Sequence, residues 1–294
     1  MSEHVPETDL REFLRTRRAR ITPEQAGLPP HPGVRRVPGL RREEVAQLAG
    51  VSVDYYVRLE RGRSTSASIS VLEAVARALQ LNDTERNHLF ALAKPARQRP
   101  RAAAAQYVRP GLLRALENIA DIPALILGHR LDVLAANHLA RALYPDFDAL
   151  PAGERNMARY MFLNDAARDL YVEWPQTART IVGMLRLHAS HHPHDPELAQ
   201  LVGDLSVSDQ DFRRWWGDHD VFQPKYGSKR YHHPLVGDIT LGYEAFTPTG
   251  DPEQTLGLYT VEPGSPSENA LRILANWTAN DAHINPDEAA RHER

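Results

Sequence analysis

The sequence predicts two domains, an N-terminal all-α domain of five helices and a larger α+β domain with an antiparallel sheet and covering helices. Three observations predict this division. The chain has 294 residues, which exceeds one small module and fits two domains. Five helical patterns fall within the first 93 residues, whereas the first strand-like segment begins only at residue 123. The predicted boundaries are residues 1–93, a linker at 94–106, the second domain at 107–280 and a flexible tail at 281–294.

Composition and charge narrow the classes of protein that the chain can belong to. It contains no cysteine, which excludes disulfides and cysteine-bound metals and suits a reducing cytoplasm. Its N-terminus is polar and acidic, unlike a signal peptide. Its longest apolar run, at 123–127, is too short to cross a bilayer, so we expect no membrane partner.

The charge is divided unevenly along the chain. Residues 1–110 hold 19 Lys and Arg against 12 Asp and Glu, a net +7, and the remainder holds 16 against 26, a net −10. A basic front half predicts that this half alone meets a polyanion, although a chance division of charges remains open.

The first domain begins with an amphipathic helix at 9–20, followed by a Pro- and Gly-rich loop. Two short helices follow over 42–62, then a fourth at 68–79. Asn82 and Asp83 predict the start of a fifth helix, which Pro95 ends.

Residues 42–62, REEVAQLAGVSVDYYVRLERG, form the strongest motif. Two helices that meet at a sharp angle need a small residue at the crossing and a backbone that can turn left-handed. Ala46 meets the first requirement and Gly50 the second. Ser52 is placed to cap the second helix and Gly62 to end it. The spacing predicts a helix-turn-helix, although such pairs also occur in proteins that bind no nucleic acid.

The outer edge of the second helix carries the candidate base contacts. In such motifs its first turn enters the major groove. Arg58 suits guanine, Val53 a thymine methyl, and Asp54 either cytosine N4 or plain solvent. Candidate phosphate contacts are Ser52, Tyr55, Arg61 and Arg63, with Arg35, Arg36, Arg41 and Arg42 flanking the first helix of the motif. The predicted partner is double-stranded operator DNA, in the cytoplasm at the nucleoid.

The second half of the chain combines strand-like and helical patterns. Strand-like runs at 123–128 and 131–136 are joined by a tight connection, and alternating strands return at 238–246 and 254–262. Helical patterns lie at 137–143, 154–170, 175–191, 196–205, 208–217 and 269–277, and Ser267 is placed to cap the last of them. Strands at both ends of a helical stretch predict an antiparallel sheet with helices on one side.

Residues 9–93 resemble the Xre/Cro-type helix-turn-helix regulators. RVPGLRREEVAQLAGVSVDYYVRLERGR (36–63) is more specifically similar to the N-terminal domain of MmyB-like regulators of actinobacteria. The segments that resemble the MmyB-like ligand-binding domain, in the same order, are NHLA (137–140), MLRLHA (184–189), WWGDHDV (215–221), YHHPLVG (231–237) and YTVEPGSPS (259–267). The resemblance implies a PAS-like second domain, a transcription regulator rather than an enzyme, and a fatty-acid-like apolar ligand as the one candidate bound molecule. Helix-turn-helix regulators of this kind usually act as two-fold dimers, so we expect a homodimer.

An acyl-type ligand needs an apolar cavity with one or two polar anchors. Arg186, His219 or His233 can pair with a carboxylate, while core packing for the aromatic residues and a solvated face for the arginines remain alternatives. The candidate ligand-binding residues are Asn137, Arg179, Met184, Arg186, Trp215, His219, Phe222, His233, Tyr243 and Tyr259.

Two other functions remain open. His219 with the nearby aspartates, or His232 and His233, can be interpreted as catalytic dyads of an acyl hydrolase fused to a DNA-targeting module, but no convincing nucleophile accompanies them. The back half can also be a module that binds another protein. HASHHPHD (188–195) is rich in histidine, but Pro193 interrupts the helix that a fixed metal geometry would use, so we predict no metal site.

Overall fold

The computed structural model describes residues 6–29, 35, 37, 39–62, 67–93 and 106–284, with side chains from residue 9 to residue 277. Its contacts divide the chain into two compact units. The first comprises residues 1–103 together with 182–203 and 213–223, and the second comprises 104–181, 204–212 and 224–294. Most of the predicted linker (94–105) and most of the predicted tail (285–294) lie outside the described residues. The predicted domain boundaries therefore stay predictions.

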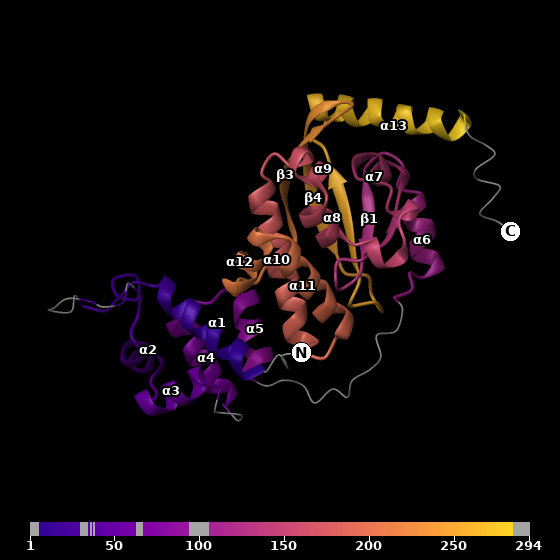
Figure 1. Ribbon diagram of the computed structural model, residues 1–294. Coiled ribbons are helices and arrows are strands. Elements are labelled where there is room, and N and C mark those ends of the chain that lie inside the picture. Colours follow the sequence, from indigo (N-terminus) through magenta and orange to yellow (C-terminus); the bar gives the residue numbers. More distant parts are fainter. Residues whose placement is uncertain are drawn as a thin grey trace. The chain divides into compact units, whose positions relative to one another are not determined.

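The N-terminal part of the first unit is a bundle of five helices, as the sequence predicts (Figure 1). Its core is built from apolar residues at helical spacing. The fully buried ones include Phe13, Leu14, Tyr56, Leu59 and Leu72. The helices are α1 (Pro6–Arg20), α2 (Arg42–Ala49), α3 (Val53–Glu60), α4 (Ile69–Ala78) and α5 (Asp83–Ala93).

Capping residues set where these helices begin. The Ser68 hydroxyl accepts a hydrogen bond from the Val71 amide at 3.2 Å, and the Asn82 side chain accepts one from the Glu85 amide at 2.9 Å. Each bond satisfies an amide that has no partner inside the helix. The predicted starts of the fourth and fifth helices are thus confirmed.

The second unit contains a five-stranded antiparallel sheet in the order β2-β1-β5-β4-β3. Four strands coincide with the predicted segments, and β3 is an addition. Its sequence, YGSKRYHH, has no run of β-branched residues and only two buried side chains, so its period of two is hidden. The strands are β1 (Ala124–Leu127), β2 (Val133–Ala136), β3 (Tyr226–His233), β4 (Gly237–Phe246) and β5 (Thr255–Thr260).

Both faces of the sheet are covered at β1, whereas the sequence predicts helices on one side only. Ala124, Leu125 and Ile126 are consecutive and all buried, although their side chains alternate between faces. Helix α6 (Pro110–Glu117), an addition to the predicted helices, packs Leu116 against Ala124 and Ile126. The added helix accounts for the second covered face.

The remaining helices follow the predicted order. The last one begins at Pro266 and is capped by Ser265, whose hydroxyl accepts from the Glu268 amide at 3.2 Å. The prediction that Ser267 caps it is wrong, because that hydroxyl accepts from the Thr240 amide in β4. These helices are α6 (Pro110–Glu117), α7 (His138–Leu143), α8 (Met157–Leu163), α9 (Asp165–Leu170), α10 (Trp174–His191), α11 (Pro196–Ser208), α12 (Gln210–Gly217) and α13 (Pro266–Ile284), with 3-10 turns η1 (Phe147–Ala149) and η2 (Ala152–Glu154).

Among the described residues, every helix falls short of the length or the apolar character that crossing a membrane would require.

Candidate DNA-binding surface and ligand-binding domain

The elbow between α2 and α3 has the geometry that the motif predicts. Gly50 adopts φ +66°, in the left-handed region where a side chain costs free energy, and its N–H donates to the Gln47 carbonyl at 3.2 Å. Ala46 is fully buried at the crossing. Gly62, with φ +72°, follows the end of α3. The helix-turn-helix is therefore present, and its two glycines set the limits of the second helix.

Helix α3 buries one face and exposes the other. Tyr56 and Leu59 have 0% exposure, whereas Val53 is 44% exposed. Asp54 and Arg58 are also exposed. Ser52 caps the helix by accepting from the Tyr55 amide at 3.2 Å, and the Arg58 guanidinium lies 5.9 Å from the centroid of the half-buried Tyr55 ring. The candidate base-contacting residues thus share one solvent-exposed edge.

The segment before α2 is fixed against α1 by a close backbone approach. A Cβ at Gly39 would lie 2.4 Å from the Arg18 carbonyl oxygen, so only glycine fits there. The Leu40 amide donates to the same oxygen at 3.0 Å, and the Arg18 guanidinium donates to the Leu40 carbonyl at 2.7 Å. This contact sets the start of α2 and hence the place of Arg42 at its first turn.

Arg35 and Arg41 are held beside the same helix start. Arg35 donates to both carboxylate oxygens of Glu44 at 2.9 Å, and that pairing lowers the pKa of Glu44 and raises the pKa of Arg35. The Glu44 carboxylate also accepts from the Arg41 amide at 2.7 Å, which caps α2. Arg36 and Arg63 lie outside the described residues.

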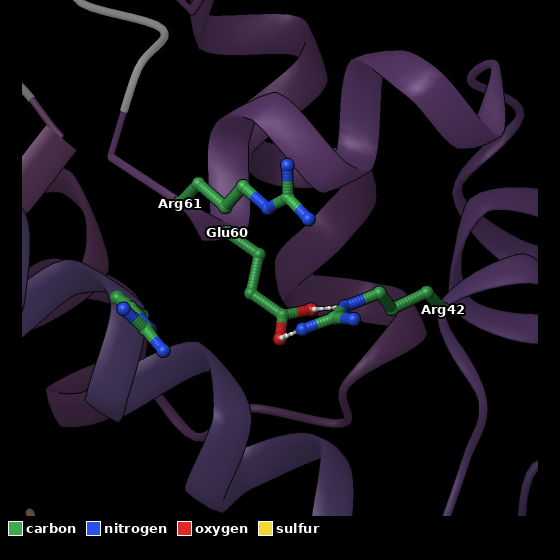
Figure 2. Close-up of a pocket in the computed structure, with 4 residues that line it drawn as sticks. Arg42, Glu60 and Arg61 are labelled. Carbon is green, nitrogen blue, oxygen red and sulfur yellow. Dashed lines mark hydrogen bonds and ion pairs between the residues drawn. The ribbon is translucent and has the colours of Figure 1, made fainter.

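A pocket of about 220 Å³ lies among Arg11, Arg42, Glu60 and Arg61 (Figure 2). Glu60 is 1% exposed and accepts from Arg42 at 3.1 and 3.3 Å and from Arg18 at 3.2 Å. Hydrogen bonding to Glu60 raises the pKa of Arg42. Within the described part of the chain, Arg61 has no carboxylate partner. Three arginines around one carboxylate leave the pocket cationic, which suits a phosphate group. Arg11 and Glu60 are not among the predicted site residues.

The ten candidate ligand-binding residues do not gather in one compact unit. Five belong to the first unit and five to the second. The first set is Met184, Arg186, Trp215, His219 and Phe222, and the second is Asn137, Arg179, His233, Tyr243 and Tyr259.

In the first unit, Arg186 and His219 lie together in a buried polar cluster. Arg186 is 4% exposed, and burial lowers its pKa to about 10. One of its guanidinium nitrogens lies 3.0 Å from His219 Nδ1, another donates to the Trp216 carbonyl, and the guanidinium carbon lies 4.1 Å from the centroid of the Trp216 ring. The Arg17 guanidinium donates to the His219 carbonyl at 2.7 Å. These contacts give Arg186 and His219 a structural role in the first unit.

The apolar candidates of the first unit differ in burial. Trp215 is buried in α12 and Met184 is half-buried in α10. Phe222 is 42% exposed, but its ring lies over Gly183, where a Cβ would come within 2.3 Å of the ring. The absence of a side chain at Gly183 therefore leaves the space that the Phe222 ring occupies.

In the second unit, the side chains of two polar candidates are engaged in hydrogen bonds to backbone groups. Asn137 accepts from the amides of Ala124 and Ala140 at 3.0 and 2.9 Å and donates to two further carbonyls. His233 Nε2 lies 3.0 Å from the Ala142 carbonyl, and the Leu235 amide donates to its Nδ1 at 3.3 Å. Both side chains thus fix the backbone around α7. Arg179 is exposed on α10.

Tyrosines form the centre of the second unit. Tyr144 and Tyr231 are buried, and their hydroxyls lie 3.0 Å apart. The Tyr171 ring centroid lies 5.1 Å from that of Tyr231, and the Tyr259 ring centroid lies 6.0 Å from that of Tyr144. Tyr243 and Tyr259 face each other across β4 and β5. These last two are predicted site residues, whereas Tyr144, Tyr171 and Tyr231 are additions, although Tyr231 opens the YHHPLVG segment.

Lys229 lies at the edge of this cluster. Its ammonium nitrogen is 4.8 Å from the Tyr243 ring centroid, 5.9 Å from that of Tyr259 and 6.0 Å from that of Tyr171. Lys229 is not among the predicted site residues, because the sequence pattern does not reveal β3 as a strand. Alternation from Tyr231 and His233 would have placed Lys229 on their face of the sheet.

The histidine-rich segments form contacts between residues close in the sequence. His232 Nδ1 lies 2.6 Å from a carboxylate oxygen of Asp238, and both side chains are exposed. His188 stacks on His192 at 4.2 Å between ring centroids, and its Nε2 lies 3.7 Å from an Asp195 oxygen. The serines at 265 and 267 are engaged in backbone hydrogen bonds.

A helix-turn-helix with an exposed edge, followed by a separate α+β domain, defines a DNA-binding transcription regulator with a domain for a small-molecule ligand. Comparison with known families agrees. Residues 9–89 match the helix-turn-helix domain family, and residues 108–274 match the MmyB-like transcription regulator ligand binding domain. The second match covers more than half of the chain, so the chain belongs to the MmyB-like transcription regulators. A comparison with curated proteins found no match.

Proposed function

We propose that this regulator binds operator DNA through the exposed edge of α3, with Val53, Asp54 and Arg58 facing the bases. The observation that carries this proposal is that the edge is open to solvent while the opposite face of α3 packs into the core. A helix presented in this way fits the major groove, where Arg58 can donate to guanine through two N–H groups.

The cationic pocket beside α3 supports the same orientation. Arg42 at the start of α2 and Arg61 just after α3 both line it. A DNA phosphate bound there would meet three guanidinium groups while Glu60 holds Arg42 in place. Ser52, Tyr55, Arg35 and Arg41 are the further backbone contacts of this proposal, and each phosphate contact adds to the salt dependence of binding.

The experiment measures binding to the promoters of neighbouring genes by fluorescence anisotropy at two salt concentrations. Arg58→Ala should lose about 1–3 kcal/mol of preference for the specific site. Arg61→Ala should weaken binding to every sequence and lower the salt slope by about 1. Arg114→Ala, an exposed arginine at the end of α6, is the matched control and should bind like the parent. Parent-like binding by both test variants would contradict the proposed interface.

For the second domain we propose a PAS-like sensor of a small apolar ligand with a fatty-acid-like chain, acting in a cytoplasmic, nucleoid-associated homodimer without catalytic activity. The family match, the five-stranded antiparallel sheet and its covering helices support the sensor. In a two-fold dimer the two α3 helices would read half-sites about 34 Å apart. Native mass spectrometry tests both parts, because it gives the oligomer mass and the mass of any co-purified ligand. Turnover of an acyl ester by the purified protein would favour the hydrolase alternative instead.

A further inference from the structure

Lys229 is a half-buried cation whose surroundings are aromatic. Three tyrosine ring faces lie within 6.0 Å of its nitrogen. Among the residues that the structure describes, no carboxylate lies within ion-pair distance of it. The next residue, Arg230, in contrast forms an ion pair with Glu173. Ring faces attract an ammonium but accept its hydrogen bonds only weakly, so Lys229 keeps N–H donors for an anion.

A strip of small residues runs beside the tyrosines on the same face of the sheet. Gly257 in β5 pairs with Ala245 in β4 and with Leu125 in β1, so these three lie side by side next to Tyr259 and Tyr243. A Cβ at Gly257 would have no heavy atom nearer than 3.9 Å. Gly257 and Ala245 are only partly covered. A glycine in the middle of a strand often marks a place where a ligand approaches the backbone closely.

We propose that Lys229 binds the head of an amphipathic carboxylate whose apolar body lies along the Gly257–Ala245 strip. This inference rests on the proposed sensor function and assigns its polar anchor. The other candidate anchors are engaged elsewhere, since Arg186 and His219 bond to each other and His233 bonds to backbone groups of the fold. Lys229 combines a free charge with an adjoining apolar floor, which is the pairing that such a ligand requires.

The test uses the full-length protein and two probes that differ only in the head group. Laurate carries a carboxylate, and dodecanol has the same chain length with an uncharged hydroxyl. Isothermal titration calorimetry below the micelle concentration gives both dissociation constants. In Lys229→Met the dissociation constant for laurate should rise at least about 10-fold, because a charge-assisted hydrogen bond is lost. The dissociation constant for dodecanol should stay within about 2-fold, because the apolar strip is intact.

Two variants separate the charge from the fold. Lys225→Met makes the same change at an exposed lysine four residues earlier and should bind laurate like the parent. Lys229→Arg keeps the cation and should bind laurate more tightly than Lys229→Met does.

Gly257→Leu tests the strip. The leucine side chain should occupy the space over the strip and weaken the binding of laurate and dodecanol alike. In Gly257→Ala the added Cβ meets only ordinary contacts, so this variant should bind both probes more tightly than Gly257→Leu does. Equal laurate affinity in the parent and Lys229→Met would overturn the anchor and leave the sensor function standing. If neither probe binds the parent, the inference and the proposed apolar ligand both fail. A circular dichroism spectrum like the parent's must accompany each variant.

Discussion

The two units hold their buried polar groups in different ways. In the first unit, guanidinium groups pair with carboxylates, as Arg18 does with Glu60 and Arg17 with Glu85. In the second unit, neutral tyrosine hydroxyls meet in the core, as those of Tyr144 and Tyr231 do. Burial raises the pKa of both phenols well above the usual value, so this pair stays neutral at any physiological pH.

The difference bears on what each unit does. A buried ion pair that loses one partner leaves an uncompensated charge, which is strongly destabilising. A hydroxyl pair that loses one member leaves only one unsatisfied polar group. The first unit therefore holds its arginines near α3 in one sharply defined arrangement, as a surface that reads DNA requires. The second unit can change its core contacts at a lower cost in stability, which suits a domain that admits a ligand.

The largest effect is expected from Glu60→Gln. Glu60 is 1% exposed, and its carboxylate compensates Arg18 and Arg42. The isosteric amide removes the charge and leaves these guanidiniums without a counter-charge, so we expect unfolding of the first unit to become easier by about 3 kcal/mol. Urea denaturation followed by circular dichroism measures the change.

The matched control for Glu60→Gln is Glu43→Gln. The Glu43 side chain is 61% exposed and lies 3.7 Å from Arg41. Exposed ion pairs contribute little, so the free energy of unfolding should change by less than about 1 kcal/mol. Similar losses in the two variants would show that burial does not set the cost of the Glu60 substitution.

A smaller effect is expected in the second unit from Tyr231→Phe. The substitution preserves the ring and removes one hydrogen-bond partner of the Tyr144 hydroxyl, which lies 3.0 Å away in the core and also interacts with the Tyr171 hydroxyl. We expect a loss of about 1–3 kcal/mol. The double variant Tyr144→Phe with Tyr231→Phe should lose less than the sum of the single variants, because it leaves neither hydroxyl behind. Additive losses in this double-mutant cycle would mean that the two hydroxyls do not interact.

Local signals in the sequence predicted most of the fold. Gly50, Ser52 and Gly62 each impose a backbone conformation by their own chemistry, so the helix-turn-helix and its exposed edge could be found without a structure. The strands β4 and β5 could also be predicted, because an alternating pattern of residues is itself a local signal. Strand β3 was missed because five of its eight residues are exposed, so no apolar alternation appears.

The candidate ligand site was harder to predict because it depends on contacts between distant segments. Lys229 lies beside Tyr171 through the packing of β3 against α9, which no local pattern reveals. Polar residues with suggestive chemistry, such as Asn137 and His233, instead bond to the backbone around them. Only the three-dimensional structure shows which polar side chains are engaged in hydrogen bonds within the fold and which remain available to a ligand.

The smallest effect concerns pH and again separates the units. In the first unit His88 is 2% exposed, and burial, with Arg186 and Arg17 nearby, lowers its pKa well below 6.5. The unfolded chain then binds the proton first, so the stabilisation is present above about pH 6.5 and is lost as the pH falls below it, by at most about 1.4 kcal/mol per pH unit. His88→Phe should flatten the change in urea midpoint between pH 7.5 and 5.5.

His233→Phe in the second unit removes a histidine whose pKa is lowered by burial and raised in part by the Ala142 carbonyl, so it should flatten the change less. An unaltered pH dependence in His88→Phe would mean that other groups carry the acid sensitivity of the first unit.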